Sequence, residues 1–214
     1  MPVDLAALVA PEHTALLTVE VQQDVVGADS ILPDLAAASG SMVPNIAALA
    51  RAARAAGARV VHCTAEHRPD RQGSSHNARL FLATSKRREP GPPGPPTPAV
   101  LHPDLGAEPS DLVIPRLQGL SPLYDSGVDA ALRHMGITTI VATGVSVNVA
   151  LLATVIEGVN RAYQVVVPRD AVAGVGAEYV EAVLDNTIAL LATLTTTQAL
   201  VDIWSVSPMG SLAR

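Results

Sequence analysis

Short runs rich in Val, Ile, Leu and Thr alternate with segments of helical periodicity along most of this sequence. Several of these runs are continuously apolar, which is typical of strands with both faces buried in a parallel sheet. The alternation predicts an α/β fold, a three-layer αβα sandwich around a parallel sheet of five or six strands. The expected strands are residues 14–21, 59–65, 111–117, 138–145, 164–172 and a last one beginning within 193–200, and the expected helices are 43–58, 126–136, 148–163 and 177–192.

The pattern breaks between residues 68 and 110, in an otherwise continuous single domain spanning residues 1–214. The segment REPGPPGPPTP, residues 88–98, is expected to form neither a helix nor a paired strand, because proline has no amide hydrogen. It predicts an exposed, stiff loop over about residues 85–110. A recognition segment for a proline-binding partner, a lid and a subunit contact are the alternatives.

Composition excludes several classes of protein. The net charge of −6 argues against a nucleic-acid or anionic-membrane surface. The N-terminal residues have no basic region typical of a signal peptide, and no apolar run approaches the roughly 20 residues that span a bilayer. The single cysteine, Cys63, rules out an intramolecular disulfide and fits a reducing compartment, so we expect a cytoplasmic protein.

The candidate site follows from the sheet, because open parallel sheets bind ligands at the carboxyl ends of their strands. Glu20 interrupts the apolar run of residues 14–21, and a carboxylate there predicts either a pocket or a structural ion pair. Arg116, at the end of its own run, is a candidate partner or a surface residue. Ser146 precedes a helix and is expected to cap it rather than to act as a nucleophile.

Two other groups of residues are given a structural interpretation. Cys63 is expected to be a small buried apolar side chain. The spacing of the histidines and acids after the second strand fits no zinc template, so we expect neither a metal nor a cofactor; these residues are His62, Glu66, His67, Asp70 and His76.

The order of motifs resembles the isochorismatase-like hydrolase superfamily, which includes nicotinamidases, N-carbamoyl amidases and isochorismatases. TALLTVEVQQDVV resembles the opening strand with its Asp-x-Gln-x-Asp-Phe motif, and VIPRLQGLSPLY resembles the lysine segment. GVSVNVALLATVIEGVNRAYQVVVPRDAVAG is similar to the Gly-Val-x-x-Asn-x-Cys turn, its helix and the following strand. The resemblance covers residues 14–200 and implies an isochorismatase-like, Rossmann-like fold.

The resemblance also implies where the site residues lie. Glu20, Arg116 and Ala150 stand where the family's cysteine hydrolases have Asp, Lys and Cys. Alanine forms no thioester, so the family's covalent route is closed to this chain. The family tends to have a cis peptide in its turn, which here is Val145–Ser146. The substrate-binding residues expected from the same motifs are Gln22, Val145, Ser146 and Asn148.

We therefore expect a small-molecule hydrolase that acts without a cysteine nucleophile, on a small carboxylate or enol ether. Glu20 supplies acid or base chemistry, and Arg116, which keeps its proton near neutral pH, anchors an anion. Backbone amides at Ser146 and Ala150 cradle an oxyanion or the substrate. The alternative is a degenerate family member that binds a small anionic ligand or serves an assembly role. The resemblance and the Ala- and Leu-rich helices 43–58 and 177–192 further imply a homo-oligomer, a dimer or a tetramer.

Overall fold

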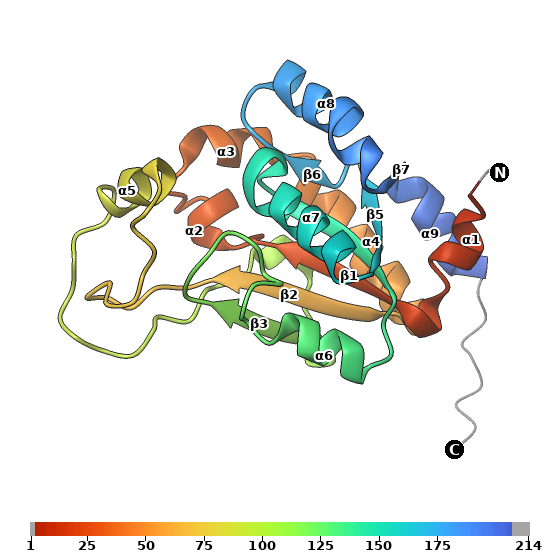
Figure 1. Ribbon diagram of the computed structural model, residues 1–214, viewed down its shortest axis with the longest axis horizontal. Helices are drawn as coiled ribbons and strands as arrows, with labels where there is room; N and C mark the ends of the chain where they lie inside the picture. The colour runs from red at the N-terminus through yellow and green to blue at the C-terminus, as the bar shows by residue number, and fades with distance from the viewer. Residues whose placement is uncertain (1–2, 207–214) are drawn as a thin grey trace.

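The computed structural model describes residues 3–206 and contains one parallel sheet (Figure 1). Its strand order is β3-β2-β1-β4-β5-β7, with the short β6 paired to the end of β4. Every pairing is parallel, which confirms the α/β prediction. The strands are β1 (Thr14–Val19), β2 (Arg59–Ala65), β3 (Leu112–Arg116), β4 (Thr139–Val145), β5 (Gln164–Pro168), β6 (Val172–Ala173) and β7 (Thr193–Thr195).

Helices cover both faces of this sheet, because successive strand residues point to opposite sides. On one face Leu16, Val60 and Val141 pack against α4 (Met42–Ala56) and α9 (Thr197–Val206). On the other face Leu17 and Ile140 pack against α6 (Val128–His134), α7 (Leu152–Asn160) and α8 (Ala177–Asn186). The result is the three-layer sandwich that the sequence predicts.

The shorter helices lie at the two ends of the sheet (Figure 1). At the carboxyl ends of β1 and β2 are α2 (Gln23–Val26), α3 (Pro33–Ala38) and α5 (Arg79–Ser85). At the opposite end α1 (Leu5–Leu8) lies beside α9, where the buried indole of Trp204 donates a hydrogen bond to the carbonyl oxygen of Val9, 2.9 Å away. Single helical turns of 3-10 type are Pro11–His13, Pro103–Leu105 and Ile188–Leu190.

Several sequence predictions need correction in detail. The last predicted strand is only three residues long, and the chain then turns into α9, which was not predicted. The run 164–172 is two strands, β5 and β6, rather than one. The helix expected from residue 148 begins with a π-helical turn, Val147–Leu151. Helix α4, expected over residues 43–58, ends at Ala56, because Gly57 adopts the left-handed conformation and its amide closes the last turn.

The start of β3 is held by a buried polar network on the α4 side of the sheet. Both carboxylate oxygens of Asp111 accept hydrogen bonds from Arg54 of α4, at 2.9 and 2.7 Å. His62 of β2 lies 3.1 Å from the same carboxylate and 2.8 Å from the hydroxyl of Thr18. Burial opposes the charge of Asp111, yet hydrogen bonds from Arg54, the Glu108 amide and His62 keep the pKa of its carboxyl below the usual value. Arg116 is therefore at the end of an anchored strand.

The proline-rich segment lies at the surface, and five of its prolines, Pro90, Pro92, Pro93, Pro95 and Pro98, are exposed. Its non-proline residues nevertheless fasten it along the ends of β1 and β2. The amide of Gly91 donates to the carbonyl of Pro69 at 2.8 Å, and that of Ala99 donates to the Glu66 carboxylate at 3.0 Å. Thr97 forms an isolated antiparallel bridge with His67, which corrects the expectation that this segment pairs with nothing.

Only one of the two helices that motivated the prediction of a homo-oligomer has an apolar surface left exposed. The apolar face of α4 packs against α9 and the sheet within the same chain, so it is not free for another subunit. The segment of α8 and the turn after it does expose large apolar side chains, including Tyr179 and Leu190. A homo-oligomer therefore stays a prediction. Across residues 3–206, no helix combines the length and the apolar character that crossing a bilayer requires.

Gly144 marks the closest approach of two strands. A Cβ atom there would lie 2.2 Å from the carbonyl oxygen of Val19, in the neighbouring strand β1, and its φ of +103° is in a region that favours glycine. We predict that Gly144→Ala lowers the free energy of unfolding by at least about 3 kcal/mol, because strain and a backbone clash add. Urea denaturation followed by circular dichroism measures the change.

Gly57→Ala is the matched control. Gly57 has a similar φ of +90°, but open space surrounds its Cβ position. This variant is expected to lose about 1 kcal/mol, the cost of the backbone conformation alone. Equal losses in the two variants would contradict the proposed clash.

Candidate active site

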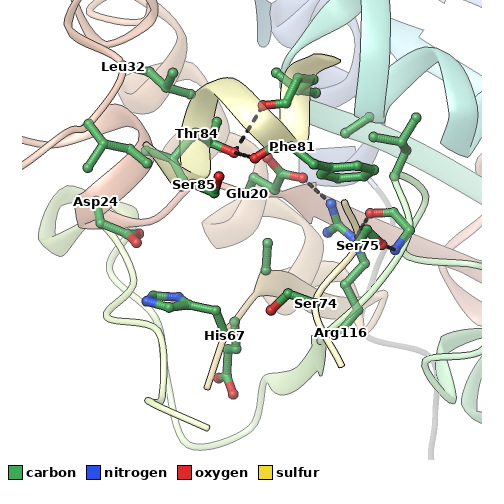
Figure 2. A pocket seen from close by; sticks show the side chains of 18 of the residues that line it. Glu20, Asp24, Leu32, His67, Ser74, Ser75, Phe81, Thr84, Ser85 and Arg116 are labelled. Carbon is green, nitrogen blue, oxygen red and sulfur yellow. Dashed lines mark hydrogen bonds and ion pairs between the residues drawn. The ribbon is translucent and has the colours of Figure 1, made fainter. Parts of the chain in front are cut away.

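A cavity of about 240 Å³ opens at the carboxyl ends of β1, β2 and β3. Its walls come from these strand ends, from α2 and α3, from the turn before α7 and from α5, which lies over it (Figure 2). The residues at the three predicted catalytic positions, Glu20, Arg116 and Ala150, line this one cavity. They are far apart in sequence and are brought together by the order β3-β2-β1-β4.

Glu20 is the first residue after β1, and its backbone is unusual. Its amide continues the ladder by donating to the carbonyl of Cys63 at 2.9 Å, but its φ of +55° turns the chain out of the sheet. A glutamate in the left-handed region costs free energy, and such residues persist where the surrounding structure holds them. The turn directs the carboxylate into the cavity, where its side chain is 18% exposed.

Arg116 completes an ion pair with Glu20. Its Nη2 donates to the Glu20 carboxylate, and its Nε donates to the carbonyl of Gly119 at 3.4 Å. The third nitrogen, Nη1, is buried and has no hydrogen-bond partner within the described residues. Figure 2 shows the guanidinium between Glu20 and Ser75. Arg116 is thus partly paired, with one donor left for a ligand.

The turn before α7 supplies the third wall. Ala150 is buried and lines the cavity, and Ser146 lies beside it. The peptide Val145–Ser146 is cis, as the resemblance implied. Ser146 occupies the predicted N-cap position, but its hydroxyl makes no capping hydrogen bond; its carbonyl instead accepts from the amides of Val149 and Leu151. Ser146 therefore stands at the N-cap position, as predicted, but its side chain does not cap the helix.

The other predicted binding residues are placed differently. Gln22 lines the cavity, but its amide is already engaged: its Nε2 donates to Asp24 and to the carbonyl of Ala65, and its Oε1 accepts from the Ala65 amide at 2.9 Å. It therefore ties β1 to β2. Val145 is fully buried in β4, and neither it nor Asn148 belongs to the cavity lining.

A second polar group faces Arg116 from the other side of the cavity. Its members Asp24 and His67 follow strand ends where the sequence predicts the site, whereas Arg88 was not predicted as part of it. Arg88 forms an ion pair with Asp24, and its Nη1 lies 2.8 Å from both ring nitrogens of His67. Burial and the charge of Arg88 lower the pKa of His67. Figure 2 shows Asp24 and His67 across the cavity from Arg116. Arg88 belongs to the proline-rich segment, so this segment contributes to the cavity wall.

Cys63 lies in β2 outside the cavity lining and is fully buried. Burial raises the pKa of its thiol to about 12, although the charge of Arg116 opposes the shift. A neutral buried thiol is a poor nucleophile. Within residues 3–206 no group of three or more His, Cys, Asp or Glu side chains is arranged to hold a metal ion.

Comparison with known proteins decides the family. Residues 14–199 match the isochorismatase domain. The chain belongs to the isochorismatase family. The ureidoacrylate amidohydrolase RutB of Methylorubrum extorquens is 32% identical over 175 residues, 75% of this chain and 69% of that protein. RutB of an Enterobacter species is 29% identical over 222 residues, 96% of this chain and 94% of that protein.

Solved structures agree with this assignment. An isochorismatase family protein from Burkholderia thailandensis superposes with a TM-score of 0.74 at 26% identity, covering 91% of this chain and 96% of that one. A cysteine hydrolase from Pseudomonas syringae shares the fold, with a TM-score of 0.73 at 23% identity, over 92% of this chain and 94% of that one. In this chain, unlike in a cysteine hydrolase, the cavity contains no thiol. Residue 150 is alanine, and Cys63 lies outside the cavity lining.

Cys63 should act only by packing. We predict that Cys63→Ser changes any turnover or ligand affinity by less than about threefold, because the thiol is buried and uncharged. Steady-state assays and calorimetric titration measure the two quantities, with circular dichroism to confirm the fold. Complete loss of turnover in a folded variant would place the nucleophile at Cys63.

Proposed function

We propose that this isochorismatase family member is a small-molecule hydrolase that acts without a covalent intermediate. The observation that carries the proposal is the arrangement of Glu20 and Arg116 in one cavity beside Ala150, with the Nη1 donor of Arg116 buried and unpartnered. A carboxylate that accepts a proton and a donor that stabilises negative charge are the two groups that direct hydrolysis by water needs.

In the proposed step Glu20 takes a proton from a water molecule as the water oxygen bonds to the substrate carbonyl carbon. The carbonyl oxygen becomes an oxyanion, which accepts a hydrogen bond from Nη1 of Arg116. The bond to the leaving nitrogen or oxygen then breaks, and Glu20 returns the proton to that atom. Arg116 keeps its own proton throughout.

A covalent route lacks a nucleophile. Ala150 has no reactive group, and the hydroxyls of Thr84 and Ser85 donate to carbonyls of their own helix, α5. Ser75 accepts a hydrogen bond from the amide of Gly119 at 3.1 Å. A serine nucleophile requires an adjacent base, and within the described residues no cavity hydroxyl forms a hydrogen bond with a histidine or a carboxylate.

The relatives supply the first substrate class to test. The curated relatives are named ureidoacrylate amidohydrolases, so a small acid with a carbamoyl-type group is the first class to test. The cavity volume of about 240 Å³ suits a molecule of this size. Small enol ethers with a carboxylate are the second class.

A binding protein without turnover is the second candidate, and one observation favours it. Glu20 and Arg116 are paired with each other in the unliganded structure, so each partly satisfies the other. A ligand that raises the melting temperature but is never hydrolysed, in wild type and Glu20→Gln alike, would support this candidate.

Glu20→Gln tests the proposed base. The amide keeps the shape of the side chain but accepts no proton, so we predict that kcat falls by about 10²–10⁴-fold while ligand affinity is retained. Glu66→Gln is the matched control, because Glu66 is another carboxylate that lines the cavity and it accepts a hydrogen bond from Ala99. Equal loss in both variants would contradict a specific role for Glu20.

Arg116→Ala tests the oxyanion donor. We predict that kcat falls by about 10²–10³-fold with a smaller change in KM, since the donor acts on charge that develops in the transition state. Arg133→Ala removes a surface arginine that also forms an ion pair, with Asp129, and should leave kcat unchanged. A loss confined to KM would reassign Arg116 to ground-state binding, and a urea midpoint tests whether each variant is folded.

A further inference from the structure

Three arginines line the cavity, and only two of them are paired with carboxylates. Arg116 pairs with Glu20, and Arg88 pairs with Asp24. The third, Arg71, forms no ion pair within the described residues. The remaining cavity carboxylate, Glu66, is held by the amide of Ala99 instead.

The guanidinium of Arg71 also lacks hydrogen bonds. Its Nη2 is buried and has no partner among the described residues. An unsatisfied buried donor costs free energy, more so when the group is charged. A cost of this kind at a cavity wall is recovered when a ligand brings the missing acceptor.

The turn that carries Arg71 is fixed by its neighbours. The Arg71 amide donates to the carbonyl of Arg68, its carbonyl accepts from Ser74, and both bonds are 3.0 Å long. Asp70 accepts two hydrogen bonds from Arg68 and one from the amide of Gln72. These contacts hold Arg71 at a φ of +59°, a conformation that arginine adopts rarely. The turn therefore presents Arg71 to the cavity in a defined position.

Arg71 lines the cavity near His67. Its charge acts on His67 and helps to lower the pKa of that residue, after burial and Arg88. His67 faces Arg116 across the cavity, with Ser74 near the floor between them (Figure 2). The two unpartnered guanidinium nitrogens, on Arg71 and Arg116, thus belong to one cavity.

We propose that Arg71 binds the carboxylate of the ligand and so makes the site select a small acid over its neutral amide. This inference rests on the proposed function for the fate of the carbonyl, which Arg116 holds. Arg71 forms no ion pair within the described residues and has a buried donor without an acceptor, so it is the cavity arginine that an anionic group of the ligand suits. Arg116, already neutralised by Glu20, takes a neutral acceptor.

The test compares two probes that differ only in charge, 3-ureidopropanoate and its amide, 3-ureidopropanamide. Wild type is expected to bind the acid at least about tenfold more tightly than the amide in calorimetric titration, because charge-assisted hydrogen bonds are the strong ones. In Arg71→Gln that preference should disappear, through loss of affinity for the acid with affinity for the amide unchanged. Arg71→Lys, which keeps the charge but loses the planar fork, should retain part of the preference.

Arg79→Gln is the matched control. Arg79 is an exposed arginine at the start of α5 and is not part of the cavity lining. Replacing it by glutamine changes the net charge by the same amount as Arg71→Gln. Its variant should keep the wild-type preference for the acid, and circular dichroism of all variants tests their folding. If Arg71→Gln does not fold, the affinity of Arg71→Lys for the acid decides. An acid affinity equal to that of wild type would count against a bidentate contact with Arg71.

The outcomes separate this inference from the proposed function. Equal binding of acid and amide by wild type, no binding of the acid, or equal weakening of both probes by Arg71→Gln would overturn the role of Arg71. Arg71-dependent binding of the acid without hydrolysis would leave the inference standing and refute the hydrolase proposal. Hydrolysis of the acid and the amide at equal rates would refute the role of Arg71 and leave the hydrolase proposal standing.

Discussion

The contact between Val19 and Gly144 fixes the geometry on which the rest of the site depends. These residues are paired in register at the ends of β1 and β4, and there is no space for a side chain on Gly144. Immediately beyond this contact Glu20 leaves the sheet on one side and the turn at Ser146 begins on the other. Because both start from the same closely packed pair, the carboxylate and the wall at Ala150 are held at a constant separation. The cavity exists because two strands end together here.

Charge in this cavity is arranged in pairs rather than as a field of one sign. Two of its arginines are neutralised by carboxylates from the end of β1 and from α2. Ion pairs of this kind keep charged groups in a partly buried place at a tolerable cost in desolvation. Within the described residues, the buried side-chain atoms of the cavity lining that lack a partner belong to Arg71 and Arg116. In the proposed binding mode these two donors contact the ligand.

The fold was largely predictable from the sequence, because hydrophobic periodicity reports burial directly. Strand β2 has the predicted bounds, and the end of α4 follows from Gly57 alone. Helix α9 was missed, since threonines at 193–197 favour a strand locally whereas packing of Leu200 and Trp204 against α4 decides for a helix. Propensity is overridden there by tertiary contact.

The candidate site was predictable only in part. The positions of Glu20, Arg116 and Ala150 followed from strand ends and from motif order. Arg71 and Arg88 lie in the segment 68–110, where no periodic pattern exists. Their neighbours in space, His67 and Asp24, come from other elements. The sequence contained one hint, since Arg71 and Arg88 have no acidic residue three or four positions away with which to pair. The pairing itself depends on how the loop folds back over the sheet.

The burial of Trp204 has a consequence for spectroscopy. It is the only tryptophan in the chain. Its indole, carried by α9, is buried and donates a hydrogen bond to the carbonyl of Val9, at the end of the sheet opposite the cavity. Its emission therefore reports on whether the two terminal regions remain docked. Trp204 is not part of the cavity lining, so we expect intrinsic fluorescence to follow unfolding of this protein rather than occupancy of its site.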